Sequence, residues 1–350
     1  MVANETITPG TKISGVKRKK SEEQLDKVAV IYGGTSAERD ISLASGAAVL
    51  QGLLDAGVDA VGVDAGPNLL SDLQVLRPDR AFIVLHGPGG EDGTVQGALE
   101  WMGIPYTGSG VQASALAMDK RRCKQLWRGA GLPTAAFAVL EENSDWGQVL
   151  SELGGVAMVK PANEGSSLGM AKVTTPAELE QAWNLAAGYD ASVIAEAWLE
   201  GAEYTVAIIN RRALPVIKLE TDRAFYDYEA KYQSDDTRYI CPCGLSDERE
   251  QELQQLALSA FDSLGCRGWA RVDAMVDANG DWQLLEVNTI PGMTDHSLVP
   301  MAAKAAGISF SDLVVEIVSG AELSAFNGKA GKAIATGKPS SGAVQTEESQ

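Results

Sequence analysis

The amino-acid sequence predicts an α/β protein with a buried parallel sheet near its N-terminus. Residues 28–32 and 81–85 are continuous apolar runs, typical of strands covered on both faces, and helical patterns lie between such runs. Glycine-rich loops at residues 33–34 and 87–93 follow these two strands directly. Because ligands of open parallel sheets bind beside the carboxyl ends of the strands, we expect a binding site at these loops.

Apolar periodicity and turn residues place the remaining elements. Thr35 and Glu38 have the spacing of a capping box, which predicts a helix that starts there and ends near Ala56. A polar, aromatic loop at residues 221–243 is long for a structureless connection, and loops of that length are usually lids or binding loops. Further strands are expected at residues 60–63, 156–160, 170–173, 193–197, 204–209 and 213–220, and further helices at residues 111–130, 176–187 and 247–264.

Composition bounds the location and the partners. The 350 residues carry a net charge of −18, which argues against a nucleic-acid binder, and no apolar run approaches the ~20 residues that span a bilayer. The polar N-terminus has no apolar signal-peptide core, so we expect a cytoplasmic protein with no membrane partner. Residues 1–27 are expected to form a flexible extension and residues 323–350 a disordered tail.

A predicted β-hairpin carries the most informative pattern. The Asn-Gly pair at residues 279–280 predicts a two-residue turn, because both positions tolerate positive φ. That turn sets Asp273 opposite Glu286. It also sets Arg271 opposite Asn288, and the alternation of side chains places all of these groups on one face. The other face, expected to lie on the core, carries Val272, Ala274, Leu285 and Val287.

Opposed carboxylates on a sheet repel each other, so something must offset the charges of Asp273 and Glu286. Carboxylate and amide oxygens suit Mg²⁺, and Mg²⁺ bound by few protein oxygens usually shares its shell with phosphates. The hairpin therefore predicts a metal site for a phosphorylated ligand. The alternative is an exposed acidic face neutralised by Arg271.

A glycine- and serine-rich loop follows the strand that ends at Lys160. The glycines of residues 164–169 allow backbone N–H groups to approach a phosphate, and Ser166 and Ser167 add hydroxyl donors. The Walker A spacing is absent, and a plain Gly/Ser turn is an equally good interpretation of this loop alone. Lys120, taken alone, is interpreted as a solvated surface lysine.

Several short motifs follow one another in a fixed order along the chain. They are Gly33-Gly-Thr-Ser-Ala-Glu-Arg39, His86-Gly-Pro-Gly-Gly-Glu-Asp-Gly93, Tyr106-Thr-Gly-Ser-Gly110, Met118-Asp-Lys120, Glu164-Gly-Ser-Ser-Leu-Gly169, Tyr228-Glu-Ala-Lys-Tyr232 and Glu286-Val-Asn-Thr-Ile-Pro-Gly-Met-Thr294. Together they resemble the signatures of bacterial D-alanine–D-alanine ligases of the ATP-grasp superfamily. The resemblance covers nearly the whole chain except both tails.

This resemblance implies a three-part α/β architecture. Its parts would be an N-terminal substrate domain at residues 28–110, a central ATP-grasp domain at 111–195 and a C-terminal ATP-grasp and metal-binding domain at 196–322. The implied reaction joins two D-alanines to D-alanyl-D-alanine through a D-alanyl phosphate, at the expense of ATP, for peptidoglycan precursor synthesis. The resemblance also implies a homodimer.

Individual residues receive roles from the same resemblance. The contacts to ATP would come from Lys120, Lys160, Glu196, Trp198, Leu199, Glu203 and Lys231. Two Mg²⁺ ions, for which Mn²⁺ can substitute, would be bound by Asp273, Glu286 and Asn288. The oxyanion would be held by Arg271 and the Gly292 N–H, and the substrates would be oriented by Glu38, Ser166, Tyr232 and Ser297. His86 lies where the family has a histidine near the first D-alanine.

Three other interpretations remain open. A related ATP-grasp ligase with a different acceptor would share the hairpin, although Tyr232 resembles the dipeptide-forming enzymes, whose depsipeptide-forming relatives usually carry Phe. A non-catalytic module would be expected to have lost one of the metal-site residues or Lys160, and all are present. A Rossmann dehydrogenase is disfavoured because Gly33-Gly34 lacks the G-x-G-x-x-G spacing.

Overall fold

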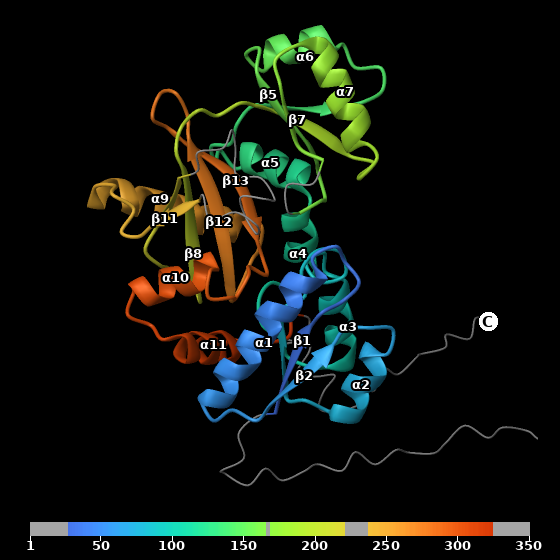
Figure 1. Ribbon diagram of the computed structural model, residues 1–350, viewed down its shortest axis with the longest axis vertical. Coiled ribbons are helices and arrows are strands. Elements are labelled where there is room, and N and C mark those ends of the chain that lie inside the picture. Colours follow the sequence, from blue (N-terminus) through green and yellow to red (C-terminus); the bar gives the residue numbers. More distant parts are fainter. Residues whose placement is uncertain (1–26, 166–168, 221–236, 325–350) are drawn as a thin grey trace, which may run out of the picture.

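The computed structural model describes residues 27–165, 169–220 and 237–324, and within them three β-sheets form the centres of three α/β parts (Figure 1). The first sheet has the order β2-β1-β3 with every pair parallel, which confirms the predicted parallel sheet. Its elements are β1 (Val28–Tyr32), α1 (Arg39–Asp55), β2 (Ala60–Asp64), α2 (Leu69–Leu76), β3 (Arg80–Ile83) and α3 (Thr94–Met102).

The capping box predicted at the start of α1 is wrong. The helix begins at Arg39, and Glu38 is the residue before it, with no side-chain capping bond. The preceding turn is held instead by Ser36, whose hydroxyl accepts from the Glu38 N–H at 3.2 Å and donates to the backbone oxygen of His86 at 2.7 Å. The turn is therefore tied to the loop after β3.

The second sheet is antiparallel, with the order β4-β7-β5-β6, and lies at the top of Figure 1. Helix α7 covers it and starts with a complete capping box between Thr175 and Glu178. The Leu179 side chain of that helix is fully buried against Val159 and Val193 of the sheet. The elements are β4 (Phe137–Leu140), α6 (Trp146–Glu152), β5 (Ala157–Pro161), β6 (Ala171–Val173), α7 (Pro176–Ala186) and β7 (Val193–Ala197).

The third sheet has the order β11-β10-β8-β12-β13, with β9 paired to β8. Part of the loop predicted at residues 221–243 is strand, because Arg238–Ile240 forms β11 beside β10; residues 221–236 lie outside the described chain. The elements are β8 (Glu203–Ile209), β9 (Arg212–Ala213), β10 (Ile217–Glu220), β11 (Arg238–Ile240), α9 (Asp247–Ser263), β12 (Trp269–Val276) and β13 (Trp282–Asn288).

The single helix predicted at residues 111–130 is two helices, α4 (Val111–Met118) and α5 (Lys120–Gly129). Asp119 between them has extended backbone angles, and its side chain accepts a 3.0 Å hydrogen bond from the Arg122 N–H and so caps α5. Side chains such as Trp127 bury these helices in the core of the third sheet. The division of the chain at residues 110, 195 and 322 stays a prediction.

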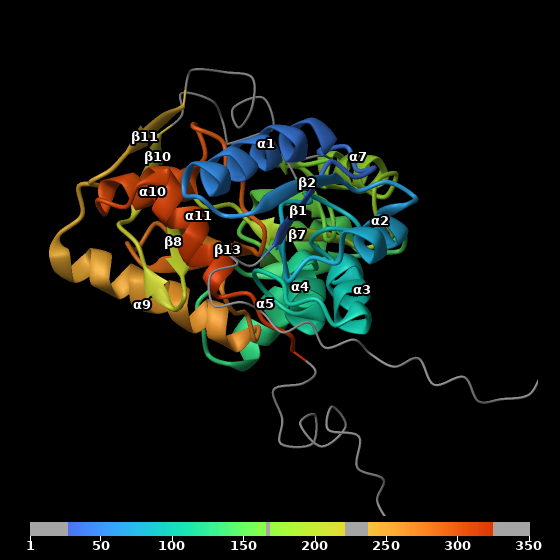
Figure 2. The same ribbon diagram turned by 90° about the horizontal axis from the view of Figure 1, so that it is seen from below.

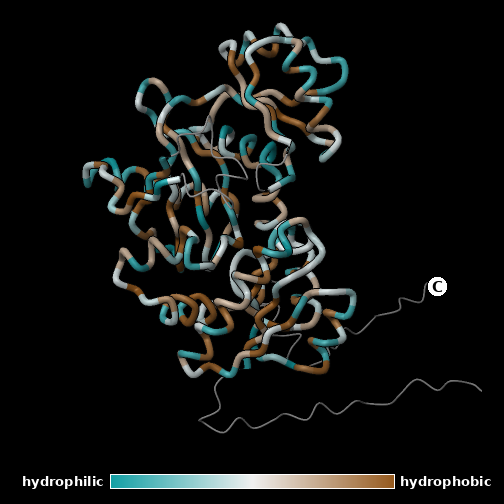
Figure 3. Tube along the Cα trace, in the orientation of Figure 1, coloured by the Kyte–Doolittle hydropathy of each residue, from teal (hydrophilic) through white to brown (hydrophobic). Residues whose placement is uncertain are grey.

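Of the last two described helices, α10 (Leu298–Ala305) packs on β8 of the third sheet, and α11 (Phe310–Ser319) returns to α1 and β3 of the first part (Figure 2). Gly52 of α1 permits this approach, since a Cβ atom there would lie 2.9 Å from the Phe310 ring. Figure 3 shows hydrophobic segments gathered where α11 meets β1. No single described helix is long and apolar enough to cross a membrane; α10 and α11 would qualify only as a pair, and they are bent by 107°.

The hairpin of β12 and β13 has the predicted pairs at Asp273 and Glu286 and a different turn. Arg271 opposes Asn288 and Asp273 opposes Glu286, as expected, but a β-bulge between Asp273 and Ala274 shifts the register. Ala274 therefore pairs with Leu284, and the turn consists of Ala278, Asn279 and Gly280, closed by a 2.9 Å bond from the Asp277 N–H to the Asp281 oxygen. The predicted two-residue turn is wrong. The bulge beside Asp273 shifts the register back, so the predicted pair of Asp273 and Glu286 still forms.

The bulge changes which leucine enters the core. Leu284 is fully buried, whereas Leu285, predicted to face the core, is only half-buried. Leu284→Ala is therefore expected to lower the free energy of unfolding by about 2–5 kcal/mol, the usual cost of a buried leucine. Leu285→Ala should cost no more than about 1 kcal/mol, because less apolar surface returns to water. Urea unfolding of both variants measures this, and an uninterrupted ladder would give the opposite order.

Candidate active site

Lys120, the first residue of α5, connects the third sheet with the loop after β5. Its Nζ lies 3.4 Å from Oε2 of Glu286 and donates a 2.8 Å hydrogen bond to the backbone oxygen of Glu164. The side chain is 13% exposed, so the interpretation of Lys120 as a solvated surface lysine is wrong. The N-terminal end of a helix also favours negative charge. This corner of the molecule is therefore suited to an anionic ligand.

Asp273 on β12 is held by three neighbours. Arg271 donates to both carboxylate oxygens, at 2.9 and 2.8 Å, Thr205 donates at 2.5 Å, and Nδ2 of Asn288 donates at 3.0 Å. Arg271 and Lys120 thus offset the charges of the opposed carboxylates, so repulsion between these carboxylates does not by itself require a metal ion. The oxygens of Asp273, Glu286 and Asn288 still have the chemistry that Mg²⁺ prefers. Among the described residues, no group of three or more His, Cys, Asp or Glu is placed to hold a metal ion.

Glu38 lies where the first part of the chain faces the phosphate loop. A Cβ atom on Gly87 would lie 2.9 Å from its Oε2, and one on Gly165 would lie 3.2 Å from its Oε1. Glycine at both positions therefore leaves room for this carboxylate. The loop after β1, the loop after β3 and the loop after β5 meet at Glu38, which agrees with the binding site expected at the strand ends.

Glu91 is a carboxyl group of this site that the sequence analysis did not single out. The Gly87 N–H donates a 2.7 Å hydrogen bond to its Oε2. Burial and the nearby charge of Glu38 raise the pKa of Glu91 to about 8, with a further contribution from Glu286. Glu91 is therefore mostly neutral near pH 7. Its place in a glycine-rich loop at a strand end was the available signal.

His86 is buried beside the same loop. Burial lowers the pKa of this imidazole to about 4, and the positive charge of Arg271 contributes in the same direction. The ring is therefore neutral near pH 7. Its Nε2 makes no hydrogen bond to any of the residues that the structure describes. A buried polar atom without a partner in the protein is suited to a polar ligand.

Lys160 and Glu196 form a buried ion pair between adjacent strands β5 and β7. Nζ of Lys160 lies 2.8 Å from Oε1 of Glu196, and Nζ of Lys124, a second buried lysine, lies 3.3 Å from Oε2. Burial would raise the pKa of Glu196, but Lys124 and Lys160 outweigh it, so the pKa is below its usual value. The sequence analysis missed Lys124; its one signal is the spacing of one helical turn from Lys120.

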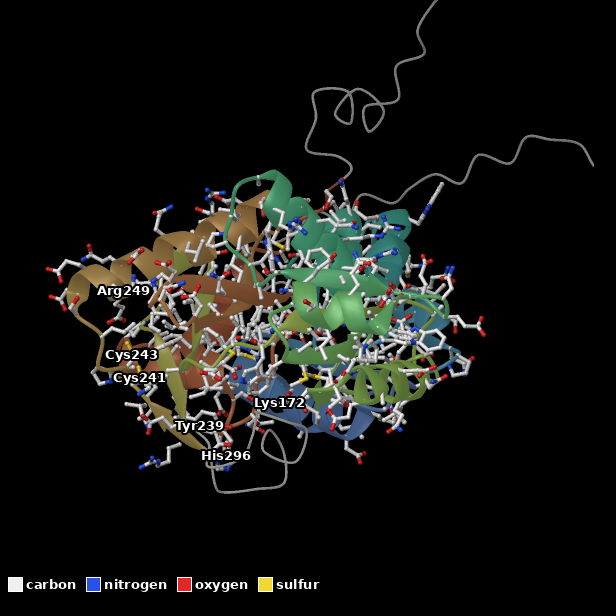
Figure 4. All side chains as sticks on the ribbon, turned by 90° about the horizontal axis from the view of Figure 1, so that it is seen from above. Lys172, Tyr239, Cys241, Cys243, Arg249 and His296 are labelled. Atoms are coloured by element: carbon white, nitrogen blue, oxygen red, sulfur yellow. The ribbon has the colours of Figure 1, made fainter. Side chains whose placement is uncertain are left out.

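The residues predicted to contact adenosine lie where the second sheet passes into the third. Trp198 and Leu199 link β7 to β8, and Glu203 begins β8. Nζ of Lys172, which Figure 4 labels, lies 3.9 Å from the centre of a Trp198 ring, a cation–π contact.

Gly292 and Ser297 lie close together in space. A Cβ atom on Gly292 would be 2.9 Å from Oγ of Ser297, and that hydroxyl accepts a 2.9 Å bond from the Thr294 N–H. Ser166, Lys231 and Tyr232 lie outside the described residues.

Cys241 and Cys243 form no part of this arrangement. Figure 4 shows both on the side of the molecule that carries Arg249 and apart from Lys172. Burial raises the pKa of each thiol, and Glu250 contributes to this. Such thiols are less reactive than ordinary ones.

Two family models match the chain. The one described as D-ala D-ala ligase C-terminus matches residues 126–319, and the one described as D-ala D-ala ligase N-terminus matches residues 68–109. The D-alanine–D-alanine ligase of Saccharophagus degradans is 57% identical over 84% of this chain and 94% of that protein. That of Stutzerimonas stutzeri is 58% identical over 85% of this chain and 94% of that protein.

Solved structures give the same result. A D-alanine–D-alanine ligase from Bacillus anthracis has a TM-score of 0.75 at 35% identity and covers 84% of this chain and 97% of that one. A structure of the Bacillus anthracis ligase complexed with ATP has a TM-score of 0.74 at 32% identity, with the same coverage.

The three α/β parts, and the lysines and carboxylates that meet between them, define an ATP-grasp protein. The family models identify a narrower family within this class. So do the relatives, which this chain matches over nearly their whole length. The chain belongs to the D-alanine–D-alanine ligase family.

The neutral state of His86 has a consequence for stability. Between pH 6.5 and about 4 the unfolded chain binds a proton at this imidazole and the folded chain does not, so stability falls as the pH is lowered through this range. The expected slope is about 1.4 kcal/mol per pH unit for one proton. His86→Gln should remove this contribution to the pH dependence of urea unfolding.

His296→Gln is the matched control, since it makes the same change at the second histidine of the chain, which is exposed. An equal acid sensitivity in wild type and His86→Gln would contradict the buried neutral imidazole.

Proposed function

We propose that this protein is a D-alanine–D-alanine ligase, which joins two D-alanines with ATP through a D-alanyl phosphate and supplies D-alanyl-D-alanine for peptidoglycan precursors. The single observation that carries the proposal is the cluster of Glu38, Lys120, Arg271 and Glu286, in a chain 57% identical to a ligase of that name. ATP is the implied nucleotide, since a solved relative is complexed with it.

Phosphoryl transfer turns the unreactive carboxylate of the first D-alanine into an acyl phosphate with a good leaving group. We propose that Lys120 and Lys160, together with Lys231, bind the phosphates of ATP and balance the charge that builds up during transfer. Glu196, Trp198, Leu199 and Glu203 would hold the adenosine portion. Mg²⁺, with Mn²⁺ as a substitute, would be held by Asp273, Glu286 and Asn288 and would neutralise the transferring group.

Bond formation between the two D-alanines requires the amine of the second to reach the acyl carbon of the first. The oxyanion that forms there would be stabilised by Arg271 and by the backbone N–H of Gly292. Glu38, Ser166, Tyr232 and Ser297 would orient the substrates, and the neutral Nε2 of His86 would add a polar contact to the first D-alanine. No protein nucleophile is required.

The D-alanyl phosphate intermediate must be kept away from water, because acyl phosphates hydrolyse. We propose that the segment that contains Lys231 and Tyr232 closes over the bound substrates. The homodimer and the cytoplasmic location stay predictions.

A screen of phosphate release from ATP against single amino acids tests the proposal. D-Alanine should give the highest rate, with D-alanyl-D-alanine as the product identified by mass spectrometry. A different preferred acceptor would instead support the related ligase with another specificity, and no turnover with any amino acid would support the non-catalytic module.

The metal-site assignment predicts a large effect of Glu286→Gln. The substitution preserves the size of the side chain and removes its charge, so ligation should fall by roughly 100-fold or more, because metal stabilisation of the transferring group is worth several kcal/mol. Mg²⁺ with ATP raises the melting temperature of a protein that binds it only when folded. That increase should be smaller in Glu286→Gln than in the wild type.

Asp281→Asn, at the exposed turn of the same hairpin, is the matched control and should retain turnover. Near-normal ligation with normal Mg²⁺ dependence in Glu286→Gln would mean that the acidic face is solvated surface.

Acceptor choice is predicted to depend on the hydroxyl of Tyr232. Tyr232→Phe removes one hydrogen bond, worth about 0.5–1.5 kcal/mol, and preserves the ring. Ligation to D-alanine should weaken, and D-lactate should become a better acceptor relative to D-alanine. Competition between the two acceptors gives this ratio directly, and an unchanged ratio would remove Tyr232 from the specificity of the site.

A further inference from the structure

Lys124 is a buried lysine to which the proposed reaction gives no role. It lies on α5 with its side chain completely shielded from solvent. Its Nζ donates a 2.6 Å hydrogen bond to Oγ1 of Thr134 and lies 3.3 Å from Oε2 of Glu196. Burial lowers the pKa of Lys124 to about 8 and Glu196 opposes this, so the ammonium is mostly charged near pH 7. A buried charge is kept only where it is paired.

The partner of Lys124 is shared with a lysine that is proposed to bind phosphate. Glu196 holds Lys124 through one carboxylate oxygen and Lys160 through the other, at 2.8 Å. If Lys160 turns toward a nucleotide phosphate, Glu196 loses one of its two cations. A carboxylate that is 3% exposed cannot compensate with water, and an unpaired buried charge is strongly unfavourable. Lys160 can therefore move away without a large loss of stability only if another cation stays beside Glu196.

Lys124 is placed to be that cation. Thr134, which accepts its hydrogen bond, itself donates at 2.8 Å to the backbone oxygen of Leu284 on β13. The ammonium is thus anchored from the third sheet by contacts that do not involve Lys160. The same hydrogen bonds connect Glu196 on β7 with the strand that carries Glu286.

We propose that Lys124 is a positioning residue for nucleotide binding: it is the permanent counter-ion of Glu196 and thereby releases Lys160 to bind the phosphates of the nucleotide. The inference rests on the proposed function only in that Lys160 contacts phosphate. Without Lys124, the carboxylate of Glu196 retains Lys160, and a nucleotide phosphate must compete with this internal ion pair for Lys160. Binding of the adenosine portion, which does not need Lys160, is largely spared.

The test compares ADP with adenosine as ligands, each with Mg²⁺ and without D-alanine, by calorimetry. Lys124→Met retains an unbranched side chain that is one atom shorter and removes its charge. It should weaken ADP binding by roughly 10-fold or more, the equivalent of one hydrogen bond to a charged group, and adenosine binding much less. Lys304→Met, an exposed lysine of α10, is the control and should leave both affinities unchanged.

Charge rescue separates this role from a merely structural one. Lys124→Met combined with Glu196→Gln leaves no carboxylate to retain Lys160, so the ratio of ADP affinity to adenosine affinity should return toward that of Glu196→Gln alone. A structural role would instead weaken both ligands together and show no rescue. Thr134→Val, which removes the anchor of Lys124 with little change in shape, should shift the ratio in the same direction as Lys124→Met and covers the case in which Lys124→Met does not fold.

An unchanged ratio in Thr134→Val and Lys124→Met, or no rescue in the double variant, overturns the proposal. Failure of the wild type to ligate D-alanine would refute the proposed function and leave the ADP and adenosine comparison intact, so the two ideas fail separately.

Discussion

The pairing of buried charge around helix α5 is the constraint on which the site depends. Lys120 and Lys124 lie one turn apart, so one face of a single helix brings a cation to Glu286 on the third sheet and another to Glu196 on the second. Glu196 is buried and Glu286 is partly buried, and a buried charge persists only when it is paired. The break at Asp119 starts α5 at Lys120, and an uninterrupted helix would direct both lysines elsewhere.

Local signals were sufficient for much of the fold. Continuous apolar runs identified the parallel strands β1 and β3, and the hairpin strands followed from alternation. The opposition of Asp273 and Glu286 was predicted correctly from a turn that is wrong, because the bulge at Asp273 restores the register that the longer turn displaces. A bulge depends on how a strand fits its neighbours on both sides, here β8 and α9, and the sequence of one hairpin does not contain that information.

The residues that were missed have partners far away in the chain. Lys124 lies in a segment with four other basic residues, a composition typical of a solvated helix face. It is a buried, paired cation only because the fold brings Thr134 and Glu196 beside it. Glu91 likewise differs from an ordinary loop carboxylate through its burial and through the charges of Glu38 and Glu286, which come from other elements. Charge pairing across elements is a tertiary property, so sequence patterns locate the loops of the site but not its electrostatics.

The protonation states of the site follow from this crowding. The negative charges of Glu38 and Glu286 act on Glu91, while Lys120 and Arg271 are the nearby cations. If all three carboxyl groups were ionised, the region would oppose a polyphosphate and a substrate carboxylate. Burial keeps Glu91 protonated, which removes one negative charge. It also keeps His86 neutral, so that at the proposed site no extra positive charge would face a substrate ammonium. A zwitterionic amino acid presents both signs at short distance, and a site with paired ions and two neutral polar groups accepts it without leaving either charge uncompensated.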